Sequence, residues 1–102
     1  MYDVNNIKKL PTLGSHAPAA WEAFLAFDKA ALADGAIPKK YKELMAVAVA
    51  LTTQCPYCIE IHSKAARKAG ASEEELAETA FVSAALRAGG SITHATHFVQ
   101  DV

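Results

Sequence analysis

Two cysteines and a histidine have the types and the spacing of a redox site. Cys55 and Cys58 are the only cysteines of the chain, three residues apart, and His62 follows four residues after the second. Pro56 suits the first turn of a helix, because a missing N–H costs nothing there. A helix over about residues 56–69 therefore brings Cys58 and His62 onto one face and leaves Cys55 at the cap.

This setting favours the thiolate form of both cysteines. At a helix cap, unpaired N–H groups and the helix dipole stabilise negative charge, and this applies to Cys55. Cys58 instead has His62 beside it as a base, and the thiolate is the nucleophilic form of cysteine. We interpret the pair as a redox dithiol in which Cys58 attacks and Cys55 resolves.

Three other interpretations of the cysteine pair stay open. The thiols could be inert buried hydrophobes. They could hold zinc with His62, the fourth ligand then being Glu43, His16, His94 or His97. They could form a purely structural disulfide, which the lack of a secretion signal disfavours. His94 and His97 also share a helix face, so a metal or substrate role is possible, although surface histidines near a helix C-terminus are common.

Composition narrows the class of protein. The chain has 102 residues, a formal net charge of −1 and 52% hydrophobic residues, 22 residues in all being alanine. These values indicate one folded domain with a thin core of its own. No basic stripe is present to bind nucleic acid, and no apolar run is long enough to span a bilayer. We expect a cytoplasmic protein with no nucleic-acid or membrane partner.

The pattern along the chain predicts an all-α fold with about five helices. Apolar residues recur at helical spacing and no segment alternates with a period of two. We expect an irregular N-terminal lead over residues 1–14 and a single domain over residues 15–102. The predicted helices lie after Ser15 to about Asp34, from Pro38 to about Thr53, from Pro56 to about Ala69, from the capping box at Ser72 to Gly89-Gly90, and from Ser91 onward.

Two of these helices carry apolar residues that need cover. Trp21, Phe24, Leu25 and Leu32 form a stripe that we expect to be core. The helix over residues 38–53 is apolar on all sides in its middle, which indicates cover from every direction. In so small a domain, part of that cover is expected to come from a second copy of the chain, as a stable homo-oligomer.

Glu43 is the polar exception beside this apolar run. If the helices over residues 38–53 and 56–69 pack antiparallel about a turn near Gln54, Glu43 and His62 differ by only a few ångströms along the axis. That offset predicts a water-bridged contact rather than an assured direct one. A carboxylate behind a histidine beside a thiol has the order of a catalytic relay.

The stretch from Glu43 through Cys55-Pro56-Tyr57-Cys58 to His62 resembles the carboxymuconolactone decarboxylase superfamily, in its alkylhydroperoxidase D-like branch. The match is a Glu, twelve residues, then Cys-x-x-Cys-x-x-x-His, and the resemblance extends over about residues 21–98. It implies a helical bundle that assembles as trimers or hexamers and acts as a thiol peroxidase. By position, it also implies that Glu43 and His62 form the relay and that Cys55 and Cys58 form the redox pair, with no cofactor.

The expected activity is reduction of a peroxide or another small molecule through the dithiol. Attack by Cys58 gives a sulfenic acid that condenses with Cys55 to a disulfide, and an external lipoyl or thioredoxin-like dithiol restores the thiols. Two alternatives remain: a thiol-disulfide reductase that never meets peroxide, and a cofactor-free decarboxylase or isomerase that uses Glu43 and His62 as acid and base. Tyr57 stands where the well-studied hydroperoxidases, which are about twice this length, have histidine.

Overall fold

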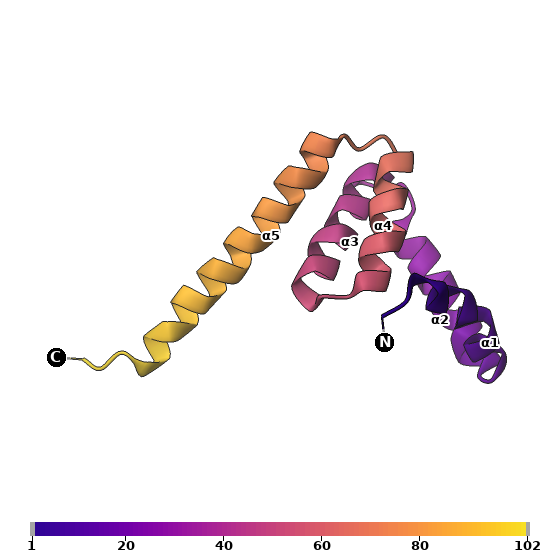
Figure 1. The fold of residues 1–102 in the computed structure, drawn as a ribbon, viewed down its shortest axis with the longest axis horizontal. Coiled ribbons are helices and arrows are strands. Elements are labelled where there is room, and N and C mark those ends of the chain that lie inside the picture. The colour runs from indigo at the N-terminus through magenta and orange to yellow at the C-terminus, as the bar shows by residue number, and fades with distance from the viewer. Residues whose placement is uncertain (1, 102) are drawn as a thin grey trace.

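The computed structural model describes residues 2–101, and helices joined by short connections make up their regular secondary structure (Figure 1). No strand occurs within these residues, which confirms the predicted all-α fold with about five helices. In chain order the elements are the 3-10 helix η1 (Val4–Lys9), the helices α1 (Leu10–Ser15), α2 (Pro18–Leu32), α3 (Lys39–Thr53), α4 (Pro56–Lys68) and α5 (Glu73–His94), and the 3-10 helix η2 (Ala95–Phe98).

The helices α3 and α4 form a hairpin at the centre of the molecule (Figure 1). Gln54 ends α3 in the left-handed conformation, with a φ of 56°, and the N–H of Cys55 donates to the carbonyl of Ala50 at 3.1 Å. This turn satisfies carbonyls at the end of α3 and reverses the chain within two residues. The antiparallel packing expected from the sequence is therefore present.

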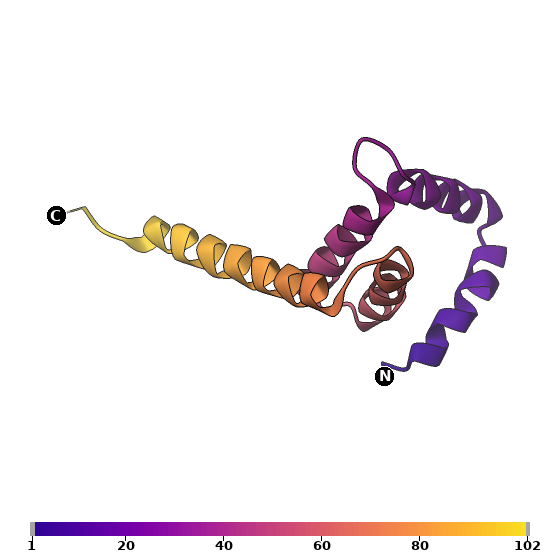
Figure 2. The same cartoon turned by 90° about the horizontal axis from the view of Figure 1, so that it is seen from above.

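Polar contacts fasten the first half of α5 to α3. Ser72 and Glu75 make the predicted capping box at the start of α5, and Glu75 also pairs with Lys40 of α3 at 3.0 Å. Further along, the buried hydroxyl of Ser83 donates to the carbonyl of Ala48 at 3.1 Å. In the second half of α5, Arg87 donates to the carbonyl of Thr52 near the end of α3 at 2.9 Å. Beyond Arg87, α5 extends away from the hairpin (Figure 2).

The expectation of an irregular lead over residues 1–14 is wrong for the residues that the structure describes. Asp3 caps η1 by accepting from the N–H of Asn5 at 2.9 Å, and Pro11 lies in the first turn of α1, where proline starts a helix. Gly14 is buried because the indole of Trp21 lies against it, where a Cβ would overlap the ring. The predicted cap Ser15 instead ends α1.

The expected helix break at Gly89-Gly90 is also wrong. The helix α5 continues through both glycines to His94, and the predicted separate last helix is its final turn followed by η2. Glycine ends a helix when it takes the left-handed conformation, as Gly70 does with a φ of 101°. Gly89 and Gly90 do not take a positive φ, so they only weaken the helix.

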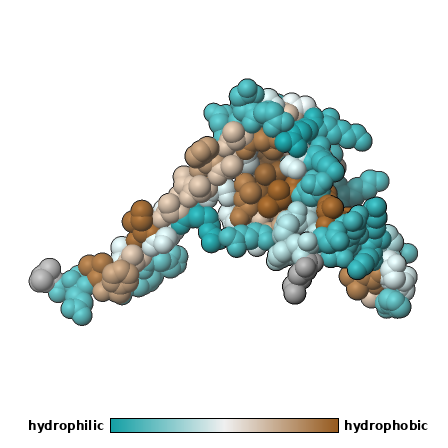
Figure 3. All heavy atoms as spheres, in the orientation of Figure 1, coloured by the Kyte–Doolittle hydropathy of each residue, from teal (hydrophilic) through white to brown (hydrophobic). Residues whose placement is uncertain are grey.

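The core within one copy of the chain is thin, as the alanine content indicated. Among the described residues, the buried hydrophobic side chains are Leu44, Val47, Ala50 and Ala66, all in the hairpin. The radius of gyration is 17.2 Å, against about 13 Å for a compact chain of this length. Apolar residues are correspondingly visible on the surface, where α5 diverges from the hairpin (Figure 3). None of the helices formed by residues 2–101 is long and apolar enough to cross a bilayer.

Candidate functional site

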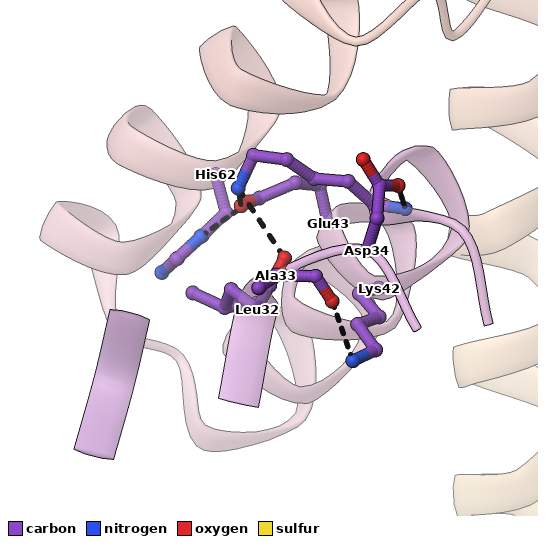
Figure 4. A network of polar contacts seen from close by, with 7 residues as sticks. Leu32, Ala33, Asp34, Lys42, Glu43 and His62 are labelled. Carbon is purple, nitrogen blue, oxygen red and sulfur yellow. Dashed lines mark hydrogen bonds and ion pairs between the residues drawn. The ribbon is translucent and has the colours of Figure 1, made fainter. Parts of the chain in front are cut away.

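Glu43 and His62 form a direct hydrogen bond inside the hairpin (Figure 4). The Nδ1 atom of His62 lies 2.7 Å from Oε2 of Glu43, where the sequence predicted a water-bridged contact. Glu43 is only 2% exposed, so it is not the solvated carboxylate that a helix start usually carries. The shorter distance follows from the tight turn at Gln54, which brings the facing turns of α3 and α4 into contact.

The other oxygen of the Glu43 carboxylate is bonded to Lys39, one helical turn earlier. Lys39 Nζ lies 3.1 Å from Oε1 of Glu43 and 3.4 Å from the carbonyl of Leu32 at the end of α2. A buried carboxylate is costly unless it is paired and hydrogen-bonded, and here both oxygens have partners. The i,i+4 spacing of Lys39 and Glu43 was the sequence signal for this pair, and it was overlooked.

The bond to Glu43 determines which nitrogen of the His62 ring can react. A carboxylate only accepts hydrogen bonds, so Nδ1 carries the proton that is shared with Glu43. In the neutral ring Nε2 is then a proton acceptor. His62 also lines the cavity that contains both cysteines, so a base and two thiols face one space.

The two thiols are in contact with each other at the start of α4. Cys55 caps the helix with extended backbone, and its Sγ accepts from the N–H of Cys58 at 3.3 Å. The Cys55 thiol donates to the Cys58 sulfur, the two Sγ atoms being 2.6 Å apart, and both cysteines are free. When Cys55 loses its proton, the Cys58 thiol becomes the donor to the Cys55 thiolate. Because Cys55 lies outside the helix, its side chain can approach Cys58 more closely than two helical positions three apart would allow.

This arrangement orders the ionisation of the two thiols. The hydrogen bond from the Cys58 thiol, followed by the Cys58 N–H, lowers the pKa of Cys55. The same thiol–thiol bond, together with burial, raises the pKa of Cys58 to about 11. The first thiolate therefore forms on Cys55, whereas the sequence-based interpretation assigned the attacking thiolate to Cys58.

A cavity of about 490 Å³ opens beside the thiols and His62. The α2 stripe of Trp21, Phe24 and Leu25 forms one wall, and Phe24 and Leu25 are each about half exposed. The expectation that this stripe is core is therefore wrong. It was missed because helical spacing shows which residues share a face but not whether that face meets a core or a cavity. The remaining lining residues are Asn6, Ile7, Leu10, Asp28, Tyr57 and Ile61.

Tyr57, between the cysteines, connects the N-terminal segment to the site. Its hydroxyl accepts a hydrogen bond from the side chain of Asn6 at 3.0 Å, and its ring packs against Tyr2 with centroids 5.8 Å apart. This contact brings η1 over α4 and closes one side of the cavity. No motif in the first ten residues indicated this role.

The histidines named as further candidates lie elsewhere. His94 and His97 pack with ring centroids 5.6 Å apart at the end of α5, and neither lines the cavity. Within residues 2–101, no cluster of three or more histidine, cysteine or acidic side chains is arranged to hold a metal ion. The fourth zinc ligand considered above is therefore not brought to the cysteines.

We predict that alkylation of the reduced protein starts at Cys55. At neutral pH the lowered pKa gives Cys55 the larger thiolate fraction, and iodoacetamide reacts with thiolates. Replacing Cys58 by alanine removes the donor that stabilises this thiolate, so the alkylation midpoint of Cys55 should move to higher pH. Cys58→Ser, which keeps a hydroxyl donor, should move it less. Peptide mass spectrometry across pH measures both effects, and first labelling at Cys58 would contradict the ionisation order.

Comparison with known proteins identifies the family of the chain. The family model described as the carboxymuconolactone decarboxylase family matches residues 18–101. Uncharacterized protein 4 in the cox locus of Paracoccus denitrificans is 46% identical over 98 residues, covering 93% of this chain and 88% of that protein. An uncharacterized protein of Cupriavidus necator is 35% identical over 89 residues, covering 87% and 79% respectively.

Solved structures share the fold at similar identity. The apo crystal structure of a carboxymuconolactone decarboxylase family protein from Legionella pneumophila is 37% identical, with a TM-score of 0.76 over 88% of this chain and 80% of that one. A crystal structure from Methanobacterium thermoautotrophicum is 32% identical, with a TM-score of 0.79 over 84% and 97%. The chain therefore belongs to the carboxymuconolactone decarboxylase family.

Proposed function

We propose that the protein is a thiol-dependent peroxidase of the alkylhydroperoxidase type. The observation that supports this most is the convergence of two touching thiols and a carboxylate-bound histidine on one apolar cavity. The lowered pKa of Cys55 favours its thiolate, which is the nucleophilic form, and a second thiol in contact can resolve the oxidised product. An apolar wall suits an organic hydroperoxide better than a strongly hydrated substrate.

In the first step the Cys55 thiolate attacks the terminal oxygen of the hydroperoxide. The O–O bond breaks, Cys55 becomes a sulfenic acid, and the alkoxide takes a proton to leave as an alcohol. The N–H of Cys58 and its thiol, which stabilise the thiolate, hold the reacting sulfur at the cavity. The ionisation order supports Cys55 as the attacking residue, in place of the Cys58 assignment made from the shared helix face.

In the second step Cys58 condenses with the sulfenic acid. The thiolate is the attacking form of cysteine, so Cys58 must lose its proton, and His62 on the same face of α4 is the candidate base, accepting the proton at Nε2. The S–S bond forms and water leaves, so one hydroperoxide and two thiols give one alcohol, one water and one disulfide. An external dithiol of the lipoyl or thioredoxin-like type then reduces the disulfide.

Single cysteine variants test the two roles. Cys58→Ser should still react once with an organic hydroperoxide and accumulate a sulfenic acid on Cys55, because the resolving thiol is absent. Cys55→Ser should lose peroxide reduction. Trapping with a sulfenate-specific reagent followed by mass spectrometry reads both outcomes. A sulfenate that accumulates on Cys58 in Cys55→Ser would restore Cys58 as the attacking residue. If wild-type thiols reduce disulfides but never peroxides, the alternative of a thiol-disulfide reductase holds.

Glu43→Gln should slow turnover by about 10²-fold or more near neutral pH. A glutamine amide can donate to Nδ1 of His62, which moves the ring proton to Nε2 and removes the base. Glu60→Gln is the matched control, because it removes an exposed carboxylate from α4 itself. Melting temperatures of the three proteins separate a catalytic loss from unfolding. Equal turnover of Glu43→Gln and wild type would show that Glu43 only supports the hairpin.

We also propose that the protein works as a homo-oligomer, a trimer or hexamer by resemblance. Phe81, Leu86 and Ile92 of α5 are each at least 70% exposed, and burying side chains of this size is worth about 1.5–3 kcal/mol each. A second copy that covers them would supply the core that one chain lacks.

Light scattering at micromolar concentration should therefore report a mass well above that of one chain. Leu86→Glu should shift the protein toward monomer, because association would bury an unpaired charge. Glu74→Gln, an exposed change in the first turn of the same helix, should leave the mass unchanged. A monomeric wild type would contradict the proposal.

A further inference from the structure

Asp28 is an acidic side chain on the apolar wall of the dithiol cavity. It follows Trp21, Phe24 and Leu25 at helical spacing, so the face of α2 that carries the aromatic residues also carries one carboxylate. The rings of Trp21 and Phe24, which precede Asp28 on this face, stack with their centroids 6.1 Å apart. In the part of the chain that the structure describes, none of the ion pairs involves Asp28.

The charges around the cavity are unbalanced. No lysine or arginine is among the described residues that line it, and Lys29, although next to Asp28 in sequence, is not part of the lining. The thiol pair adds a second negative charge when Cys55 ionises. Glu43 adds little to this negative charge, because its carboxylate is paired with Lys39. A ligand that enters the cavity therefore meets the Asp28 carboxylate on one wall and, when Cys55 is ionised, a thiolate on another.

We propose that Asp28 sets the charge selectivity of this cavity, so that uncharged organic hydroperoxides reach the dithiol and carboxylate-bearing ones are disfavoured. The substrate class rests on the proposed peroxidase function, but the selectivity itself does not. A carboxylate that enters the cavity loses hydration that the apolar walls do not replace. The Asp28 carboxylate and the Cys55 thiolate also repel it. The aromatic wall binds the apolar part of the hydroperoxide, and Asp28 discriminates between uncharged and negatively charged ones.

Two alkylating reagents measure this selectivity without any turnover. Iodoacetamide is neutral and iodoacetate is anionic, and both are of similar size and alkylate thiolates. In wild type, Cys55 should react more slowly with iodoacetate, relative to iodoacetamide, than a free thiol does. Asp28→Asn should raise that relative rate by about threefold to tenfold at low ionic strength, and added salt should reduce the difference. Because a change in the Cys55 thiolate fraction affects both reagents equally, the ratio of the two rates reports only the effect of the charge on the reagent.

Glu22→Gln is the matched control. It removes one carboxylate from the same helix at a residue that does not line the cavity. It should leave the ratio of the two alkylation rates as in wild type. If Asp28→Asn leaves the ratio unchanged, or if Glu22→Gln changes it as much, Asp28 is an ordinary solvated carboxylate and the proposal is overturned.

Peroxide kinetics then test the substrate class. Cumene hydroperoxide and its ring-carboxylate derivative differ in charge with a similar shape. Wild type should have the higher kcat/KM for the neutral compound, and Asp28→Asn should bring the kcat/KM values of the neutral and charged compounds closer together. Equal ratios in the two proteins would overturn the assignment of Asp28. Failure of wild type to reduce either compound would contradict the proposed function instead, and the alkylation ratio would still decide the role of Asp28.

Discussion

The bond between Glu43 and His62 is the contact on which the site depends. It joins α3 to α4 inside the hairpin, and it does so with a carboxylate that is 2% exposed. A buried carboxylate without partners would be expensive, so Lys39 on one oxygen and His62 on the other stabilise both the packing and the chemistry. The same bond leaves Nε2 of the neutral His62 ring as the proton acceptor.

The backbone at the start of α4 determines how the two thiols contact each other and how their pKa values differ. A proline in the first turn makes Cys55 the cap, and the cap residue has extended backbone. The Cys55 sulfur can therefore accept from both the N–H and the thiol of Cys58, and these bonds separate the pKa values of the two thiols. One local feature of the backbone thus gives two residues of the same type different tendencies to ionise.

The cavity combines elements that are distant in sequence. The aromatic face of α2, the N-terminal segment and the first turns of α4 each supply one side of it. Little of the chain is core in one copy, so apolar side chains are available both for a ligand at this cavity and for a second copy along α5. Many large apolar side chains lie at the surface, and the 22 alanines of the chain bury little area within one copy.

The sequence by itself determined the helices and the members of the polar site. Helical spacing, the proline before Cys58 and the capping box at Ser72 are local signals, and the positions of α3, α4 and the start of α5 follow from them. Gly89-Gly90 misled the prediction, because glycine has the same identity whether it continues a helix or ends one. The tertiary structure alone decided the direct contact of Glu43 with His62, the order in which the thiols ionise, and the role of the Trp21 face as a cavity wall. Each of these depends on a distance or a burial between elements, and periodicity within one helix contains no information about what the neighbouring helix places there.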